Sequence, residues 1–428
     1  MTPKPFSWTA NPWIFVPVLY FLQGAPYFVI NAVSIVVFKK LGIPNDTLLF
    51  WLSLIAWPWT LKMLWSPIVD SISTKTRWVI VTQVLNALCM VLFALTLKSS
   101  DPWTWSLVVL MIAAMVSATH DIASDGLYLI ALSHQERSFF VGLQSTAYRF
   151  SRIFVTGALV WLAGRWESSG TSVIDSWALA LKIAALIYLV GIVIFVLTRP
   201  RNERDGESIS EKIEWGVFLD YLRQPKLLSI IFFILFYRFG ESMVGSMSTP
   251  FLLDPTTSGG MGLSTEQLGN VTGVVGVIAL TLGGIVGGMV ISRWGLKRCL
   301  MPMLFSMYLP NLFYFWAAWA KPAVSAVYGI VFIDQFGYGF GFSAYLVFMM
   351  FIAQGTRFKT AHYAISTALM AAGATLASSL SGFLQVALQA HWGVSWGYPG
   401  FFAATFLMCL PGLWILKNLP LDREQPES

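Results

Sequence analysis

Residues 176–198 read SWALALKIAALIYLVGIVIFVLT, and this stretch decides the class of fold. Apart from Lys182 it carries no charged side chain, and it is long enough to cross a bilayer, which takes about 20 apolar residues in an α-helix. The rest of the chain has the same character, because 56% of its 428 residues are hydrophobic and only 11% are charged. Soluble domains carry roughly a quarter charged residues. A soluble fold could not bury so much apolar surface, so we expect lipid as the solvent.

Similar apolar stretches recur along the whole chain. We therefore predict an all-α integral membrane protein of about twelve transmembrane helices, arranged as two pseudo-symmetric six-helix bundles. The predicted spans are residues 13–38, 47–69, 78–98, 102–125, 138–163, 176–198, 227–251, 265–292, 298–318, 323–350, 359–388 and 396–417.

One long charged segment separates the two halves. Residues 199–223 read RPRNERDGESISEKIEWGVFLDYLR, and we interpret them as a solvated cytoplasmic linker with an amphipathic helix over residues 210–222. The predicted domains are an N-terminal six-helix bundle over residues 1–198, the linker over 199–226 and a C-terminal six-helix bundle over 227–428.

The two halves also resemble each other weakly. LYFLQGAPY at residues 19–27 corresponds to LFYRFGESM at 235–243, and GLQSTAYRF at 142–150 corresponds to HYAISTALM at 362–370. Parallel repeats about an axis along the membrane normal are found in secondary transporters, which bind their substrate between the halves. The glycines expected to let neighbouring helices approach closely are Gly283, Gly284, Gly287, Gly288, Gly337, Gly339 and Gly341.

The basic side chains are spread over many short loops, so the net charge of +6 does not indicate nucleic-acid binding. More Lys and Arg lie in the loops after the even-numbered predicted spans than in the other loops. The positive-inside rule then predicts that both termini are cytoplasmic. The N-terminus lacks the pattern of a cleaved signal peptide, so we expect the first helix to remain as a membrane anchor.

Enzyme and sensor functions find little support in the sequence. The three cysteines, Cys89, Cys299 and Cys409, fall in apolar stretches without metal-ligand or disulfide spacing, and the four histidines are dispersed. No nucleophile–base pair is visible, so we expect no catalytic residues and no cofactor. The linker is too short to be a soluble signalling domain.

Ionisable side chains inside predicted spans are the first candidates for a functional site, because placing a charge in lipid is costly. Arg149 and Arg152 are three residues apart and share a helix face. Two guanidinium groups facing a cavity would bind a substrate carboxylate through bidentate hydrogen bonds. The alternative is a structural ion pair with Asp121 or Asp125.

Arg238 and Glu241 share one face of the predicted span 227–251, and Asp334 lies near the middle of the span 323–350. We consider Arg238 a candidate substrate-binding residue. Glu241 and Asp334 are candidate proton carriers, since transporters use buried carboxyl groups as proton relays. The alternative is that each carboxylate is a permanently ionised partner of Arg238.

A further charged group lies toward the cytoplasmic ends of the predicted spans. We interpret Lys62, Asp70, Asp121 and Asp125 as a gating lattice that locks one conformation and opens in the other. Lys62 could instead extend its ammonium group to the membrane surface. His120 adjoins Asp121, but no third ligand follows at helical spacing, so we predict no metal site.

Aromatic residues inside the spans are abundant, and most of them would pack in the protein or lie at the membrane interface. A few that face a cavity could stack on sugar rings. The tyrosines that we select for this role are Tyr27, Tyr148 and Tyr338.

Six motifs resemble bacterial muropeptide permeases of the AmpG type, a branch of the major facilitator superfamily. They are FLQGAPY (21–27), LKMLWSPIVD (61–70), SATHDIASD (117–125), ERSFFVGLQSTAYRFSRI (136–153), FYRFGESM (236–243) and DQFGYGFGFSAYLVFMM (334–350). The resemblance extends from Leu19 to Leu416, and its most specific parts are LWSPxxD and SAxxDIxxD.

The resemblance implies a major facilitator fold in the bacterial inner membrane and proton-driven import of N-acetylglucosamine linked to 1,6-anhydro-N-acetylmuramic acid, with or without peptide. Proton coupling would rest on Glu241, Asp334 or Asp121, because the first helix carries no acidic residue. The residues on matching family positions are Lys62, Asp70, Asp121, Asp125 and Arg149, and those that match in charge type are Arg238, Glu241 and Asp334.

Another cargo stays open at this point. The same wider family resembles acetyl-coenzyme A transporters and siderophore importers, so the alternative is a carrier of another anionic solute, such as a siderophore or an acyl-coenzyme A. We expect a monomer whose partners are the lipid bilayer, protons and an anionic, sugar-containing small molecule, with no nucleic acid.

Overall fold

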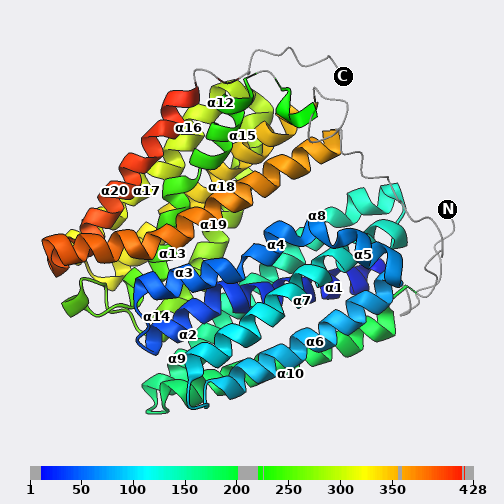
Figure 1. Ribbon diagram of the computed structural model, residues 1–428, viewed down its shortest axis with the longest axis horizontal. Helices are drawn as coiled ribbons and strands as arrows, with labels where there is room; N and C mark the ends of the chain where they lie inside the picture. Colours follow the sequence, from blue (N-terminus) through cyan, green and yellow to red (C-terminus); the bar gives the residue numbers. More distant parts are fainter. Residues whose placement is uncertain (1–10, 201–219, 225, 355–358, 417–418, 420–428) are drawn as a thin grey trace. The chain divides into compact units, whose positions relative to one another are not determined.

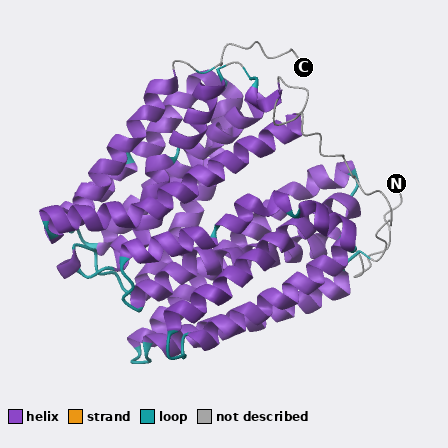
Figure 2. Cartoon of the chain, in the orientation of Figure 1, coloured by secondary structure: helices purple, strands orange, loops and turns teal. Residues whose placement is uncertain are grey.

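The computed structural model describes residues 11–200, 220–224, 226–354, 359–416 and 419 (Figure 1). Every regular element among these residues is helical (Figure 2), which confirms the predicted all-α class. Most of the amphipathic helix predicted at 210–222 lies outside the described residues.

The helices before the linker are α1 (Pro12–Phe28), η1 (Val29–Val33), α2 (Ser34–Lys40), α3 (Asn45–Ile55), α4 (Trp57–Leu61), η2 (Lys62–Leu64), α5 (Ser66–Ile72), α6 (Lys75–Thr96), α7 (Pro102–Ala131), α8 (His134–Arg152), η3 (Ile153–Leu159), α9 (Val160–Ser168) and α10 (Val173–Thr198). Those after it are α12 (Leu227–Phe236), α13 (Phe239–Leu253), η4 (Thr256–Ser258), α14 (Thr265–Leu268), η5 (Gly269–Val275), α15 (Gly276–Trp294), α16 (Leu296–Tyr308), α17 (Pro310–Ala320), α18 (Val324–Gln354), α19 (Lys359–Trp392) and α20 (Val394–Ile415). Here η1, η3 and η5 are π-helices, and η2 and η4 are 3₁₀-helices.

Ten helical runs among the described residues are long and apolar enough to cross a membrane. The two other predicted spans are helical as well. One is the run α8–η3–α9, whose first half is rich in polar and charged side chains. The other is α16 followed by α17, where Pro310 begins a new helix and divides the span into two shorter pieces.

The chain divides into two compact units, and each is considered by itself. Unit 1 comprises Met1–Ile43, Leu54–Ser210 and Ser264–Val274. Unit 2 comprises Pro44–Ser53, Glu211–Leu263 and Val275–Ser428.

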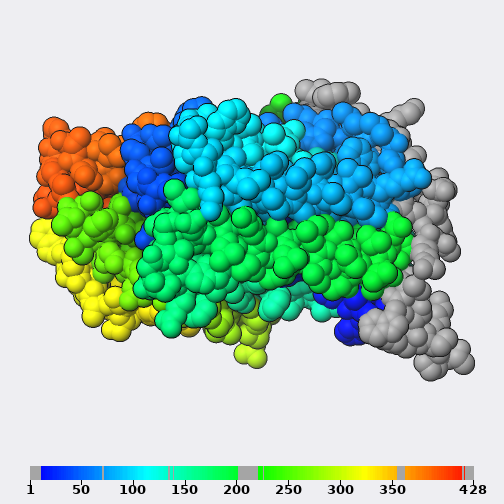
Figure 3. Space-filling view, turned by 90° about the horizontal axis from the view of Figure 1, so that it is seen from below, coloured from blue at the N-terminus to red at the C-terminus, as the bar shows by residue number. Residues whose placement is uncertain are grey.

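Unit 1 has an apolar outer face where α6 and α10 lie side by side (Figures 1 and 3). Leu88 on α6 and Leu186 on α10 are 50% and 61% exposed there, whereas the polar side chains of Gln83 and Asn86 are buried. Apolar side chains outside and polar ones inside reverse the pattern of a water-soluble helix. This face is therefore suited to contact with lipid.

Within the described part of the chain, three membrane-spanning runs contain a π-helical segment, in which the backbone leaves its regular hydrogen-bond register. A nearby hydroxyl group satisfies a carbonyl oxygen four residues back in each case, as a serine or threonine in a helix can do. The pairs are Ser34 with Ile30, Thr156 with Arg152 (2.9 Å) and Thr272 with Leu268 (2.8 Å).

The second span is interrupted close to Lys62. Its first helix, α3, ends at Ile55, and the chain continues through the short elements α4 and η2. Pro58 lies in the first turn of α4, and Pro67 lies in the first turn of α5. Proline is tolerated at this place in a helix but removes a backbone donor, so each proline marks the start of a new helical piece.

The seventh span breaks between α12 and α13 without a proline at the break. Arg238 leaves helical geometry there, with φ −112° and ψ 3°. Two tyrosine hydroxyls from other helices of unit 2 replace the missing donors: Tyr308 OH donates to the carbonyl oxygen of Tyr237 at 2.9 Å, and Tyr345 OH donates to that of Ile234. These two hydrogen bonds therefore satisfy carbonyl oxygens at the break.

Glycines bring α15 and α18 of unit 2 into backbone contact. A methyl group at Gly283 would overlap the carbonyl oxygen of Phe336, and one at Gly339 would overlap that of Leu280. Gly283 and Gly339 thus permit a close helix approach, as predicted, and the structure identifies α15 and α18 as the helices that meet. The other glycines of the prediction differ: Gly287 also faces α18, Gly337 and Gly341 face α16, Gly284 makes at most ordinary contact, and Gly288 faces open space.

We expect Gly283→Ala to lower the melting temperature of the purified protein, because overpacking of this kind costs roughly 1–3 kcal/mol. Gly288→Ala is the matched control, since nothing lies within 4 Å of its added methyl group. Thermal unfolding in detergent micelles measures both variants. Equal melting temperatures would contradict the backbone contact between α15 and α18.

Candidate functional site

Lys62, Asp121 and Asp125 come together inside unit 1. Lys62 Nζ lies 3.4 Å from Asp121 Oδ2, and Tyr20 OH donates to Asp125 Oδ1 at 3.2 Å. The buried Gln23 side chain of α1 lies close to both carboxylates. Both aspartates are on α7, four residues apart and on one helix face. The interrupted second span brings the lysine to them.

The two aspartates lie farther from the end of their helix than predicted. Helix α7 continues to Ala131, beyond the predicted end at residue 125, so Asp121 lies about 15 Å inside the helix end at 1.5 Å per residue. Lys62 is paired with Asp121, so its ammonium group does not extend alone to the surface. The side chain of Asp70 lies outside those that the structure describes.

Arg149 and Arg152 end α8, directly before the π-segment η3. Arg152 Cζ lies 5.9 Å from the centroid of the Phe28 ring, which is a cation–π distance. Arg149 forms no ion pair with another described residue. Arg149 therefore does not form the alternative structural ion pair with Asp121 or Asp125.

An aromatic cluster surrounds the tyrosines predicted in unit 1. The ring of Tyr27 lies 5.0 Å from that of Trp59 and 6.5 Å from that of Tyr148, and the rings of Phe28 and Tyr148 are 5.2 Å apart. Gly24 permits this approach of α1 and α8, because a methyl group there would lie only 3.2 Å from Tyr148 Cδ2. Tyr27 and Tyr148, predicted from distant segments, thus belong to one cluster.

Arg238 and Glu241 form an ion pair at the break of the seventh span. The distance from Arg238 Nε to Glu241 Oε2 is 3.0 Å, and Glu241 is 9% exposed. The guanidinium carbon also lies 4.9 Å from the ring centroid of Tyr338 and 5.0 Å from that of Phe342. One carboxylate and two aromatic rings therefore surround this cation.

Asp334 has other neighbours. It is 7% exposed and accepts hydrogen bonds from Tyr314 OH at 3.4 Å and from Gln335 Nε2 at 2.9 Å. Among the described ion pairs, the carboxylate that pairs with Arg238 is Glu241. The two predicted proton carriers thus differ, since one faces a cation and the other is held by neutral donors.

Sequence reasoning missed several members of both groups. Trp59 was one of the aromatic residues within the predicted spans, but it was not selected for the site. Gln23, Tyr20 and Phe342 carried no signal, because a neutral side chain in a span looks the same whether or not it touches an ion.

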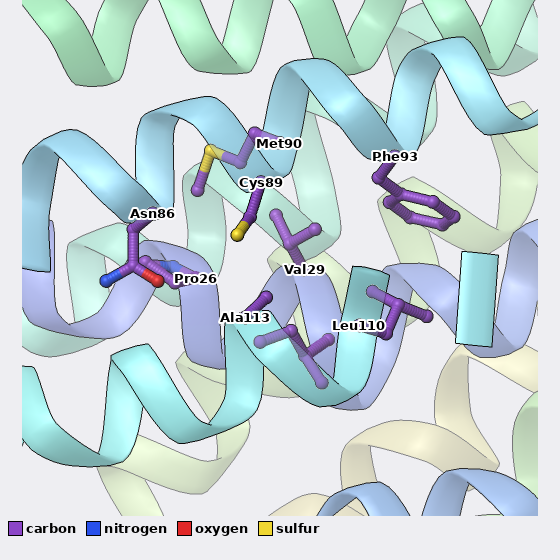
Figure 4. Close-up of a pocket in the computed structure, with 9 residues that line it drawn as sticks. Pro26, Val29, Asn86, Cys89, Met90, Phe93, Leu110 and Ala113 are labelled. Atoms are coloured by element: carbon purple, nitrogen blue, oxygen red, sulfur yellow. The ribbon is translucent and has the colours of Figure 1, made fainter. Parts of the chain in front are cut away.

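A small cavity adjoins α1 in unit 1 (Figure 4). Its volume of ≈ 10 Å³ offers roughly the room of one water molecule. Its lining is apolar apart from Asn86, so it is unsuited to a sugar. The lining residues are Pro26, Val29, Ile30, Asn86, Cys89, Met90, Phe93, Leu110 and Ala113.

We expect Tyr345→Phe to destabilise the protein by about 1–3 kcal/mol, because it leaves the buried carbonyl oxygen of Ile234 without its hydroxyl donor. Tyr328→Phe serves as control, since the Tyr328 hydroxyl has no hydrogen bond to another described residue. Unfolding of both variants in mixed detergent micelles gives the difference. If Tyr345→Phe and Tyr328→Phe have the same free energy of unfolding, the Tyr345 hydroxyl does not stabilise the break.

The sequence profile of the Major Facilitator Superfamily matches residues 18–358. The chain is 24% identical over 419 residues to a Rickettsia felis protein named as the transporter AmpG 4, and the match covers 94% of this chain and 95% of that protein. It is 23% identical over 372 residues to the anhydromuropeptide permease of Escherichia coli K12, covering 85% of this chain and 71% of the permease. These matches confirm the resemblance predicted from the motifs.

A solved structure of a bacterial homologue of the human lysosomal transporter Spinster, in an inward-facing and unoccupied conformation, has a similar fold. The TM-score is 0.73 at 15% sequence identity, and the match covers 99% of this chain and 100% of that one. At this identity the likeness shows the fold alone. It agrees with the membrane fold predicted from the spans.

Proposed function

Because the chain belongs to the Major Facilitator Superfamily, we propose that it is a proton-coupled carrier that imports anhydromuropeptides across the bacterial inner membrane into the cytoplasm. Its family and its named relatives are transporters, which supports a multi-pass membrane transporter rather than an enzyme. The proposed cargo is N-acetylglucosamine linked to 1,6-anhydro-N-acetylmuramic acid, with or without peptide. The name of the Escherichia coli relative suggests this cargo, and the chemistry of the site supports it.

Arg149 carries the proposal. A guanidinium group on a membrane-spanning run is costly unless an anion or hydrogen-bond acceptors surround it, yet Arg149 has no carboxylate among the described residues. A lactyl or peptide carboxylate of the cargo would supply the missing charge through a bidentate pair. Arg152, three residues on, shares its helix face and would extend this anion site.

The aromatic cluster beside these arginines suits the sugar rings of the cargo. Tyr27 and Tyr148 offer ring faces that can pack against the apolar faces of pyranose rings, while their hydroxyl groups can exchange hydrogen bonds. An anion site next to an aromatic cluster matches a cargo that joins a carboxylate to sugars. A small inorganic anion has no ring that could pack against the aromatic cluster.

Proton coupling is proposed for the Arg238–Glu241 pair. Protonation of Glu241 would remove its charge and release Arg238, still held between Tyr338 and Phe342, to bind an anion of the cargo. The cargo would then bind the protonated state more tightly, and such a difference in affinity is what allows a ligand to shift a conformational equilibrium. Asp334 and Asp121 are the other proposed proton carriers.

The proposed transport cycle is alternating access between two six-helix bundles, residues 1–198 and 227–428, joined by the cytoplasmic linker 199–226. Lys62, Asp121 and Asp125, together with Asp70, act in it as a gating lattice. Both termini are cytoplasmic, and the carrier works as a monomer.

The proposed cargo is tested by uptake into proteoliposomes. Proteoliposomes with an inward proton gradient should accumulate labelled anhydromuropeptide, and Arg149→Ala should lower kcat/KM by roughly 10- to 100-fold, the range for a hydrogen bond to a charged group. Arg293→Ala, which removes an exposed arginine at the end of α15, is the control and should leave uptake unchanged. Absent uptake by folded wild-type protein would rule out this cargo, and siderophores and acyl-coenzyme A would be tried next.

Proton coupling is tested by a substitution at Glu241. Glu241→Gln should abolish gradient-driven accumulation and keep counterflow exchange of cargo, because the neutral amide imitates the protonated carboxyl group permanently. Asp175→Asn is the control, since its pair with Lys98 is exposed and such surface pairs contribute little. Full accumulation by Glu241→Gln would contradict the role of Glu241 and leave Asp334 and Asp121 as candidates.

A further inference from the structure

Trp59 stands at the junction of the aromatic cluster and the charged group of unit 1. It lies in the short helix α4, directly after Pro58 and three residues before Lys62. Its ring meets the ring of Tyr27 edge to face, with centroids 5.0 Å apart and an interplanar angle of 84°. The residue as a whole is partly exposed.

The indole N–H of Trp59 is buried, yet it has no acceptor among the described residues. This is unusual, because a buried tryptophan N–H nearly always finds a partner, and an indole can only donate. Two other tryptophans of unit 1 follow the rule: Trp65 Nε1 donates to Thr119 Oγ1 at 3.1 Å, and Trp177 Nε1 donates to Glu167 Oε1 at 3.0 Å.

Trp78 is the other described tryptophan whose buried indole N–H has no acceptor. It lies in the first turn of α6 and forms no aromatic pair with another described residue. Of these two tryptophans, Trp59 is the one that belongs to an aromatic cluster and lies three residues from the ion-paired Lys62. That combination is the chemistry of a sugar subsite, in which a ring face packs against the pyranose and a donor at its edge fixes one oxygen.

We infer that Trp59 is a specificity-determining residue that binds an N-acetylated sugar ring of the cargo, its indole N–H donating to a hydroxyl or acetamido oxygen of that ring. Tyr27 and Tyr148 form the rest of this subsite. The carboxylate of the same ligand extends toward Arg149 and Arg152. This inference rests on the proposed function, and it divides the recognition between an aromatic subsite for the sugar and an arginine subsite for the acid.

Two simple ligands separate the subsites. N-acetylmuramic acid carries both a sugar ring and a carboxylate, whereas N-acetylglucosamine carries the ring alone. Binding of each is measured by saturation-transfer NMR and calorimetry on purified protein in nanodiscs. Trp59→Phe should weaken both ligands about fivefold, the value of one neutral hydrogen bond. Arg149→Ala should weaken only N-acetylmuramic acid.

Trp78→Phe is the matched control, since it removes an unpartnered indole donor outside the cluster and should leave both affinities unchanged. The melting temperature of each variant shows that it is folded. If Trp59→Phe binds both ligands as tightly as Trp78→Phe does, the inference is wrong while the proposed function stands. If folded wild-type protein binds neither ligand, both are wrong.

Discussion

The bilayer offers no water to hydrogen-bond a backbone group or to solvate a charge, and the rest of this structure depends on that constraint. The first span shows how it is met. Pro26 has no N–H, so the carbonyl oxygen of Leu22 loses its helical donor. Tyr188 OH of α10 donates to that oxygen at 3.0 Å. Here a second helix supplies the donor that the proline removes.

The seventh span meets the same constraint in unit 2. Tyr308 and Tyr345 satisfy the carbonyl oxygens that the break at Arg238 exposes. Pro26 and the break at Arg238 fall within 19–27 and 235–243, the first pair of repeats recognised in the sequence. In each unit, then, a tyrosine hydroxyl replaces a backbone donor that the span lacks.

Two kinds of intramembrane charge can be distinguished by their partners. Lys62 with Asp121, and Arg238 with Glu241, are pairs whose members cancel each other's charge at 3.4 Å and 3.0 Å. Breaking such a buried pair leaves an uncompensated charge, so proton binding or a change of conformation has a large effect there. Arg149 is of the other kind, because no described carboxylate pairs with it. The ion pairs suit a switch between conformations, and Arg149 suits the binding of an anionic cargo.

The sequence by itself determined the spans and the local pairs. Continuous apolar runs fix where the chain crosses lipid, whatever the packing, because the length of a span follows from bilayer thickness. The Arg238–Glu241 pair was readable as one possibility, since residues three apart on a helix can be neighbours. Glycine spacing indicated close helix packing, whereas the pairing of α15 with α18 came from the tertiary structure.

Only the tertiary structure decided which distant residues meet. Tyr20 and Asp125 are 105 residues apart in the chain, and nothing local to either predicts their hydrogen bond. The meeting of Tyr27, Trp59 and Tyr148 likewise depends on how three spans pack. The physical reason is that helical periodicity fixes neighbours within one helix, whereas the rotation and depth of each helix against the others come from packing that no single helix encodes.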